Sequence, residues 1–213
     1  MSILTKTELK NWDNKKRLNL INSIGGVKPA NLIGTISKSG NSNLAIFFSI
    51  LHVQSHPAQL AFLLRPTDEH RRDSWENIKE TDVFTVNAIT TNLAERAHYT
   101  SAKFPKELTE FDLCKIKSYY SPNFLAPYVA ESPIKIGCRY EEHHYLKSSR
   151  TTLIVGNIEE IIIEEYFIDP RGYIAFDKMN LVGIGGLNSY YNLEKFSEFP
   201  FARPENLPIF TDY

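Results

Sequence analysis

The sequence is poor in cysteine and has no large excess of charge of either sign. Cys114 and Cys138 are its only cysteines, so it carries no disulfide framework of the kind found in small secreted proteins. Its 24 Lys and Arg residues face 25 Asp and Glu residues, and a formal net charge of −1 gives no general attraction to nucleic acid or to anionic lipid. We therefore expect any anion-binding site to be local.

Long apolar runs are also missing. The longest, LAIFFSIL at residues 44–51, is interrupted by Ser49 and falls far short of the roughly 20 residues that a membrane helix needs. The opening stretch, MSILTKTELKNWDNKKRL, lacks the apolar core of a secretory signal. These absences predict a cytoplasmic protein with neither a membrane nor a nucleic acid as its partner.

What the sequence does contain is enough apolar material for a core, arranged in short strand-like segments. With 213 residues and 42% hydrophobic residues, we expect one domain over residues 1–213. The turn-forming KSGNSN at residues 38–43 predicts a hairpin, and Gly156 is expected to form a bulge or a bend. Strands are predicted at residues 31–36, 44–53, 60–64, 83–89, 134–146, 151–163, 173–176 and 179–184.

Short helices are expected between these strands. Asp73 and Glu76 resemble a capping box that would start a helix near Ser74, and a similar pattern begins at Asn92. The absence of βαβ alternation predicts a mainly β fold, an antiparallel, Greek-key-like barrel with a few short helices. The tail EFPFARPENLPIF is expected to lie over a surface without regular structure.

Arginines gather at the predicted start of the first of these helices. Arg65 follows an apolar strand, and Arg71 and Arg72 directly precede Asp73 and Ser74. A helix start presents unpaired N–H groups and the positive end of the helix dipole, so these amides and a Ser hydroxyl can bind phosphate. Guanidinium groups suit phosphate oxygens well, which makes this stretch a candidate phosphate site.

The same arginines could instead form ordinary surface ion pairs. Asp68, Glu69 and Glu76 are close in sequence, and Asp73 would place a carboxylate beside a bound anion. Charged clusters near helix starts are common. The residues alone leave both interpretations open.

Other motifs predict no chemistry. His52 and His56 have metal-ligand spacing only on a helix, Pro57 argues against one, and no third ligand is near. GIGGLN at residues 183–188 lacks the third glycine of a dinucleotide motif and is not followed by a βαβ unit. Cys138 lies within a predicted strand, as buried structural cysteines do. We therefore expect no metal site and assign no catalytic nucleophile.

Taken together, several segments resemble the flavin reductase-like family, whose members bind FMN in a split β-barrel. The resemblance is carried, in order along the chain, by NLIGTISKSGNSNLAIFFSI, LLRP followed by RRDSWENI, FTVNAI, AHYTSAKFPKELTEFD and IGCRYEEHHYLKSSRTTLIVGNIEEI. It is strongest from residue 31 to residue 111 and continues more weakly to residue 158. It implies that the arginine stretch is the phosphate site of the cofactor.

The resemblance also assigns parts of the flavin site to individual residues. Arg65, Arg72 and Ser74 would hold the FMN phosphate, a strand from Asn43 to Ser49 would line the isoalloxazine ring, and a segment from Thr100 to Lys103 would close the site. The full set implied for cofactor binding is Asn43, Ala45, Phe47, Ser49, Arg65, Arg72, Ser74, Thr100, Ser101 and Lys103.

The activity implied by the resemblance is hydride transfer from NADH or NADPH to FMN in a homodimer, with small-molecule flavin and nicotinamide as partners. No general acid or base is assigned, because such a transfer needs none from the protein. Phe48 stands where many relatives have a small residue, and Ala58 interrupts a frequent double proline. Two alternatives stay open: a non-enzymatic FMN-binding or carrier protein, and a flavoenzyme like pyridoxamine-phosphate oxidase.

Overall fold

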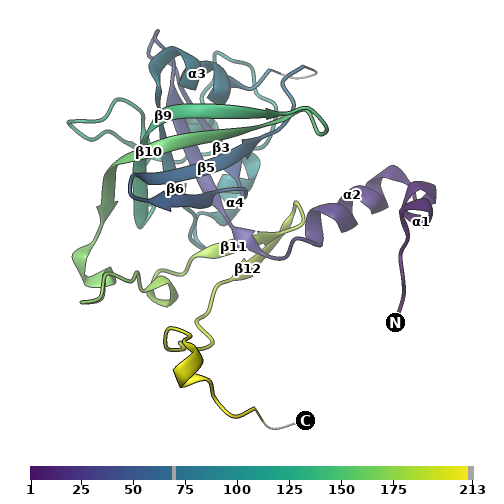
Figure 1. Ribbon diagram of the computed structural model, residues 1–213. Coiled ribbons are helices and arrows are strands. Elements are labelled where there is room, and N and C mark those ends of the chain that lie inside the picture. Colours follow the sequence, from purple (N-terminus) through teal and green to yellow (C-terminus); the bar gives the residue numbers. More distant parts are fainter. Residues whose placement is uncertain (69–70, 211–213) are drawn as a thin grey trace.

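The computed structural model describes residues 1–68 and 71–210, and its architecture is mainly β, as the sequence predicts (Figure 1). Its strands are β1 (Lys28–Pro29), β2 (Asn31–Ile36), β3 (Ser42–Phe47), β4 (Leu51–Ser55), β5 (Ala58–Leu64), β6 (Val83–Ala88), β7 (Ser118–Tyr119), β8 (Tyr128–Val129), β9 (Ile134–Leu146), β10 (Thr151–Ile163), β11 (Val182–Gly185) and β12 (Ser189–Asn192). Its α-helices are α1 (Lys6–Asn11), α2 (Asn14–Ser23), α3 (Asp73–Thr81), α4 (Ala94–Tyr99) and α5 (Glu110–Leu113), and its 3-10 helices are η1 (Glu165–Phe167), η2 (Phe176–Lys178) and η3 (Pro204–Asn206).

A 7-stranded antiparallel sheet forms the body of the molecule, in the order β3-β2-β6-β9-β10-β5-β4. β3 and β4 follow one another in sequence but lie at opposite edges of this sheet. The sheet must therefore curve until its two edges meet at residues 48–50. No ladder joins β3 to β4 among the described residues, so the barrel stays split along this seam.

Several strands and both predicted backbone irregularities are confirmed. β2, β9 and β10 have the predicted bounds, and β2 forms a hairpin with β3 through a turn in which Gly40 has a φ of 88°. The register of β10 against β9 shifts between Val155 and Gly156. A Cβ atom at Gly156 would lie 2.6 Å from the ring of Phe84, so this close approach requires glycine.

The single strand predicted at residues 44–53 is wrong, because the chain breaks between β3 and β4. Ser49 explains the break: its hydroxyl donates to the carbonyl of Leu63 at 3.2 Å and accepts from the Leu63 amide at 3.1 Å. The side chain thus takes both backbone bonds that a regular ladder would have used. The backbone is free to turn there, and this turn carries the chain from one sheet edge to the other.

Both predicted capping patterns are also wrong. α3 begins at Asp73 after Arg72 as N-cap, without a side-chain cap, because the Asp73 carboxylate pairs with Arg71 instead (Nε to Oδ1, 2.9 Å). α4 begins only at Ala94, after Leu93 as N-cap, so Asn92 caps nothing. The helices themselves lie close to where the sequence predicts them.

Aromatic packing inside the barrel holds the strands that carry the site. The Phe62 ring on β5 packs edge-on against Phe47 on β3, with ring centroids 5.1 Å apart, and against Phe84 on β6 at 5.4 Å. Phe62 and Phe84 are almost completely buried. Edge-to-face pairs add about 0.5–1.5 kcal/mol beyond the area they bury. β3 and β5 are therefore fixed relative to one another at the split.

The two ends of the chain lie apart from the barrel (Figure 1). α1, which starts with a Thr5 and Glu8 capping box, and α2 project to one side and contain no buried residue. The tail expected to cover a surface instead extends away from its own chain, so that prediction is wrong. The strand predicted at residues 173–176 is reduced to one bridge between Ile168 and Ile174. Among the described residues, no helix is long and apolar enough to cross a membrane.

Candidate functional site

A cavity of about 880 Å³ opens beside the split of the barrel. Its walls come from β3, from the turn at residues 48–49, from the end of β5, from the start of α3, from the segment after α4 and from the turn between β11 and β12. Every residue that the resemblance assigns to flavin binding lines this one cavity: Asn43, Ala45, Phe47, Ser49, Arg65, Arg72, Ser74, Thr100, Ser101 and Lys103.

One corner of the cavity concentrates positive charge at the start of α3. Arg65 comes from the end of β5 and Arg72 is the N-cap residue of α3, so two separate elements bring their guanidinium groups to one place. Burial lowers the pKa of Arg72, and the positive charge of Arg65 lowers it further. The Arg72 Nε atom is buried and has no hydrogen-bond partner, and the neighbouring Asp73 Oδ1 atom is also buried and has only its ion pair with Arg71. A buried donor without a partner is costly, which marks this corner as shaped for an anion.

The acidic residues near these arginines in sequence form ion pairs with other residues. Asp73 pairs with Arg71, Glu76 pairs with Lys79 (2.9 Å), and Asp68 pairs with Arg150 (2.6 Å). Glu69, the remaining candidate partner, lies outside the described residues. Within the part of the chain that the structure describes, Arg65 and Arg72 form no ion pair, so the surface-pairing interpretation does not hold for them.

A hydroxyl and an amide complete the polar corner. Ser74, in the first turn of α3, is buried, and its Oγ accepts a hydrogen bond from the Asn43 side chain at 3.0 Å. Asn43 also lies 3.5 Å from the Thr35 hydroxyl, which links it to the neighbouring strand. The Ser74 hydroxyl proton is therefore left to donate to a ligand. At the start of α3 the amides of Asp73 and Ser74 have no intrahelical acceptor, whereas those of Trp75 and Glu76 already donate to the Arg72 carbonyl.

Glu110 is a carboxylate in the same cavity that the sequence did not single out. Its Oε2 accepts a hydrogen bond from the Leu44 amide at 2.9 Å, so it anchors α5 to β3. Burial raises the pKa of Glu110 despite this bond, and the nearby charge of Asp73 raises it as well. The pattern T-E-F in a short helix gave no signal of this contact, which depends on two segments far apart in sequence.

Away from the charged corner the cavity is less polar. Phe47 and Ala45 contribute apolar wall from β3. The Thr100 hydroxyl donates to the Ala97 carbonyl and the Ser101 hydroxyl donates to the His98 carbonyl, both at 2.7 Å. These hydroxyls therefore hold the end of α4 in place, and their oxygen atoms remain able to accept.

A histidine and a tyrosine that the sequence did not flag also line the cavity. The His98 Nδ1 atom lies 3.1 Å from the Tyr190 hydroxyl, and burial raises the pKa of Tyr190 to about 12. Phe48 lines the cavity and packs at the same time against the core cluster around Leu44, with the Lys28 ammonium 5.8 Å from its ring centre. The direction in which the Phe48 side chain points could not be determined from the sequence alone.

Of the motifs set aside from the sequence, the histidine pair and Cys138 do not line this cavity, whereas GIGGLN contributes Ile184, Leu187 and Asn188 to its wall. His52 and His56 are exposed, and no group of potential metal ligands forms among the described residues. Cys138 is completely buried and its pKa is raised to about 12, mainly by burial, as a structural thiol would be. GIGGLN forms β11 and its turn, where Gly186 has a φ of 69°.

Comparison with known proteins identifies the family. The family model described as "Flavin reductase like domain" matches residues 27–175, which is more than half of the chain, so this chain belongs to that family. A split-barrel structure of the flavin reductase type from Shewanella frigidimarina NCIMB 400 is 31% identical, with a TM-score of 0.90, and the match covers 95% of this chain and 100% of that one.

More distant structures share the fold. Nitrilotriacetate monooxygenase component B from Bacillus cereus is 19% identical, with a TM-score of 0.82, over 93% of this chain and 98% of that one. The 2-nitrobenzoate 2-nitroreductase from Pseudomonas fluorescens is 19% identical, with a TM-score of 0.78, over 97% of this chain and 98% of that one. The split barrel expected from the sequence is confirmed, and family membership makes the chain a flavin-related oxidoreductase.

Proposed function

We propose that this protein is an FMN-dependent oxidoreductase that uses NADH or NADPH as its reductant. The observation that carries the proposal is the pair of guanidinium groups, Arg65 and Arg72, that face the cavity without a carboxylate partner while the Nε of Arg72 is buried and unbonded. A flavin with a terminal phosphate fits this donor set, because the phosphate oxygens accept from guanidinium, hydroxyl and helix amides together.

Different residues would bind the phosphate and the ring of the cofactor, at two ends of the cavity. Arg65, Arg72 and Ser74 would bind the phosphate, with Asn43 holding the Ser74 oxygen. The ring would lie along β3, where Ala45 and Phe47 supply an apolar surface. The remaining proposed contacts come from the two segments that flank the ring: Ser49, Thr100, Ser101 and Lys103.

When bound, FMN supplies a ring system that accepts a hydride from a reduced nicotinamide. The chain's own contribution is to orient and enclose: polar side chains fix the phosphate end, and Phe47 excludes water from one side. Phe48 and the His98–Tyr190 pair form the wall left for a second ring. No residue is required to hold or move a proton in such a transfer, and we propose none.

Anaerobic stopped-flow absorbance provides the test. Protein loaded with FMN is mixed with NADH or NADPH, and loss of the oxidised flavin band is compared with that of free FMN at the same concentration. Bleaching much faster than free FMN supports the oxidoreductase. Bleaching at the rate of free FMN with both nucleotides contradicts it and leaves a flavin carrier as the explanation.

The carrier is the second candidate, and the position of Phe48 favours it. This side chain lines the cavity and is held there by its packing on the core, so it narrows the space in which a nicotinamide would stack. A carrier would bind FMN with Arg72 in the same role but would show no nucleotide-dependent bleaching. A flavoenzyme like pyridoxamine-phosphate oxidase would instead show bleaching on addition of an amine phosphate.

A further inference from the structure

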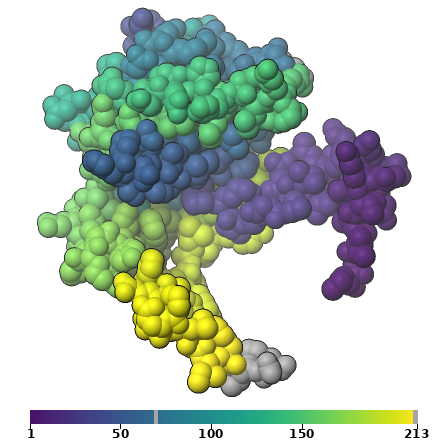
Figure 2. Space-filling view, viewed as in Figure 1, coloured from purple at the N-terminus to yellow at the C-terminus, as the bar shows by residue number. Residues whose placement is uncertain are grey.

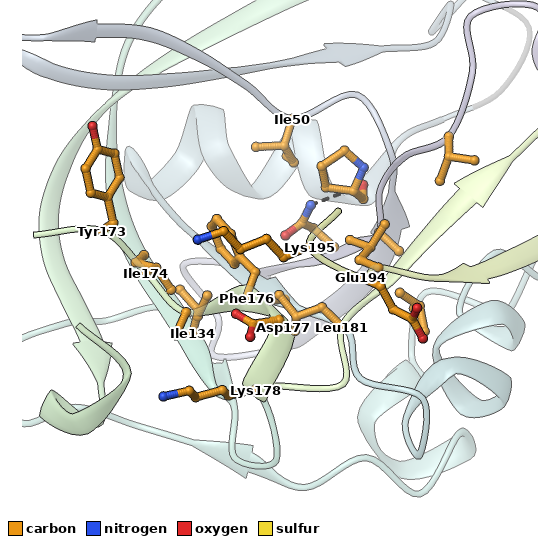
Figure 3. A pocket seen from close by; sticks show the side chains of 18 of the residues that line it. Ile50, Ile134, Tyr173, Ile174, Phe176, Asp177, Lys178, Leu181, Glu194 and Lys195 are labelled. Carbon is orange, nitrogen blue, oxygen red and sulfur yellow. Dashed lines mark hydrogen bonds between the residues drawn. The ribbon is translucent and has the colours of Figure 1, made fainter. Parts of the chain in front are cut away.

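A second hollow, of about 1210 Å³, shares no lining residue with the first cavity. It is lined by Ile134 and Ile136 of β9, by Leu51 of β4, and by Ile174 and Leu181 from the chain after β10. Figure 3 shows Ile134, Ile174 and Leu181 among the side chains that line the hollow, together with charged side chains such as Asp177 and Lys195. We call this hollow the apolar groove.

Four of the charged residues at the apolar groove form ion pairs with one another. Arg171 pairs with Asp169 at 2.8 Å and with Glu198 at 2.6 Å, and Lys195 pairs with Glu198 at 2.5 Å. These pairs leave the Arg171 guanidinium with two carboxylate partners, unlike Arg65 and Arg72 in the first cavity. Apart from Asp177, Lys178 and Glu194, much of the lining is apolar, so another apolar surface suits the groove.

Two described segments expose large apolar side chains, the N-terminal helices and the C-terminal tail, and the C-terminal tail begins at the edge of the apolar groove itself. It leaves the body after β12 and extends away from it (Figure 2). Its large apolar side chains are 71% to 97% exposed, which is far more than isolated surface residues require. They are Phe196, Phe199, Phe201, Leu207, Ile209 and Phe210.

The backbone of the tail is suited to docking in a groove. Pro200, Pro204 and Pro208 interrupt it at regular intervals, and the described part contains only the short 3-10 helix η3. Proline restricts the free chain, so less conformational entropy is lost when such a segment becomes ordered on a partner. The segment also lacks the continuous amides needed to pair as a strand.

We propose that the apolar groove of each copy binds the C-terminal tail of a second copy of this chain. The root of the tail already lines the groove of its own chain through Leu193 and Phe199, while the part beyond Phe199 turns away. Residues 200–210 span up to about 35 Å when extended, which is enough to cross to a neighbouring copy. In a twofold dimer the exchange is reciprocal, and both grooves are filled.

A disulfide cross-link between two different copies tests the arrangement. Leu51→Cys is placed in one copy and Phe201→Cys in the other, the copies carry different affinity tags, and both are produced in the same cell. Native Cys114 and Cys138 are buried, so the native chain is the control for background oxidation. After mild oxidation, pairs purified through both tags should contain a peptide linking positions 51 and 201. Doubly tagged pairs without that link, or no such pairs at all, would overturn the proposal.

A second measurement does not depend on cysteine geometry. Phe196→Ser, Phe201→Ser and Ile209→Ser are combined in one variant, and the dimer dissociation constant is measured by analytical ultracentrifugation. It should rise by at least about tenfold, whereas Arg203→Gln with Glu205→Gln in the same tail should change it by less than about twofold. Equal dissociation constants for both variants would overturn the proposal. Neither measurement involves flavin, so its failure would leave the proposed oxidoreductase untouched.

Discussion

The cavity beside the split and the apolar groove are both large, about 880 Å³ and 1210 Å³, but they differ in the groups that lack a partner. In the first cavity Arg65 and Arg72 form no ion pair among the described residues, although the carboxylates of Asp73 and Glu110 also line it. In the apolar groove Arg171 is held by two carboxylates, and the unpartnered atoms are carbons. An uncompensated charge indicates a small ionic ligand, whereas uncompensated apolar surface indicates contact with a chain.

The largest expected effect comes from removing the unpaired charge. Arg72→Ala should weaken FMN binding by roughly 10- to 100-fold, because hydrogen bonds to charged groups contribute about 1.5–3 kcal/mol. Titration of the protein with FMN by fluorescence quenching measures this. Arg139→Ala is the matched control, since Arg139 already pairs with Glu159 outside the cavity. An equal loss of FMN affinity in both variants would contradict a special role for the unpaired Arg72.

A smaller loss is expected at the hydroxyl of the same corner. Ser74→Ala removes one neutral donor and leaves the Asn43 amide without its acceptor, so FMN affinity should fall about fivefold, in line with roughly 1 kcal/mol for such a bond. The same titration applies. Ser121→Ala is the control, because Ser121 donates to Glu160 far from the cavity along the chain. A Ser74→Ala variant that binds FMN as the native protein does would remove this hydroxyl from the site.

Ionic strength should affect FMN binding and dimerisation differently, because the two hollows differ in charge. Raising the ionic strength from about 0.05 M to about 0.5 M shortens the range of charge interactions, so FMN affinity should fall by roughly threefold. The dimer dissociation constant should stay the same or decrease, because apolar burial is not screened by salt. Both are measured on the native protein. A dimer that weakens with salt as strongly as flavin binding does would mean that the apolar groove is also electrostatic.

The smallest effect is expected at Glu110 and has a defined pH dependence. Burial raises the pKa of Glu110, so the folded protein holds this proton more tightly than the unfolded chain does. The stability that this carboxyl contributes is therefore present at low pH and is lost as the pH rises through the raised pKa.

Glu110→Gln imitates the protonated form and keeps an acceptor for the Leu44 amide. It should raise the melting temperature at neutral pH, remove that part of its pH dependence, and improve FMN affinity by about twofold, because a negative charge leaves the cavity. Asp112→Asn, on the exposed side of the same helix, is the control. A lower melting temperature in Glu110→Gln at neutral pH would contradict the burial argument.

Much of the fold could be predicted because its signals are local. The apolar segments that form β9 and β10 and the turn residues before β3 are properties of short stretches. Gly156 lies at the register shift between these strands, and only glycine fits there against Phe84. The break after β3 could not be predicted, since it depends on Ser49 finding Leu63, a residue fourteen positions away. The capping box failed for the same reason: Arg71 competes for the Asp73 carboxylate.

The candidate site also contains some residues that the sequence could predict and others that it could not. Arg65, Arg72 and Ser74 stand out in sequence because charge and a helix start coincide there. Glu110 and the His98–Tyr190 pair do not, because each is brought to the cavity by packing between distant segments. A single polar residue in a helix or a strand gives no sequence signal for the cavity that its side chain will face.

The most direct test of the central claim is a comparison of FMN with riboflavin, which has the same ring system but no phosphate. Dissociation constants of both are measured by calorimetry for the native protein and for Arg72→Ala. We predict that the native protein binds FMN at least about tenfold more tightly than riboflavin, and that Arg72→Ala loses most of this advantage. Equal affinities in the native protein, or an advantage unchanged in Arg72→Ala, would contradict the assignment of this corner to the flavin phosphate.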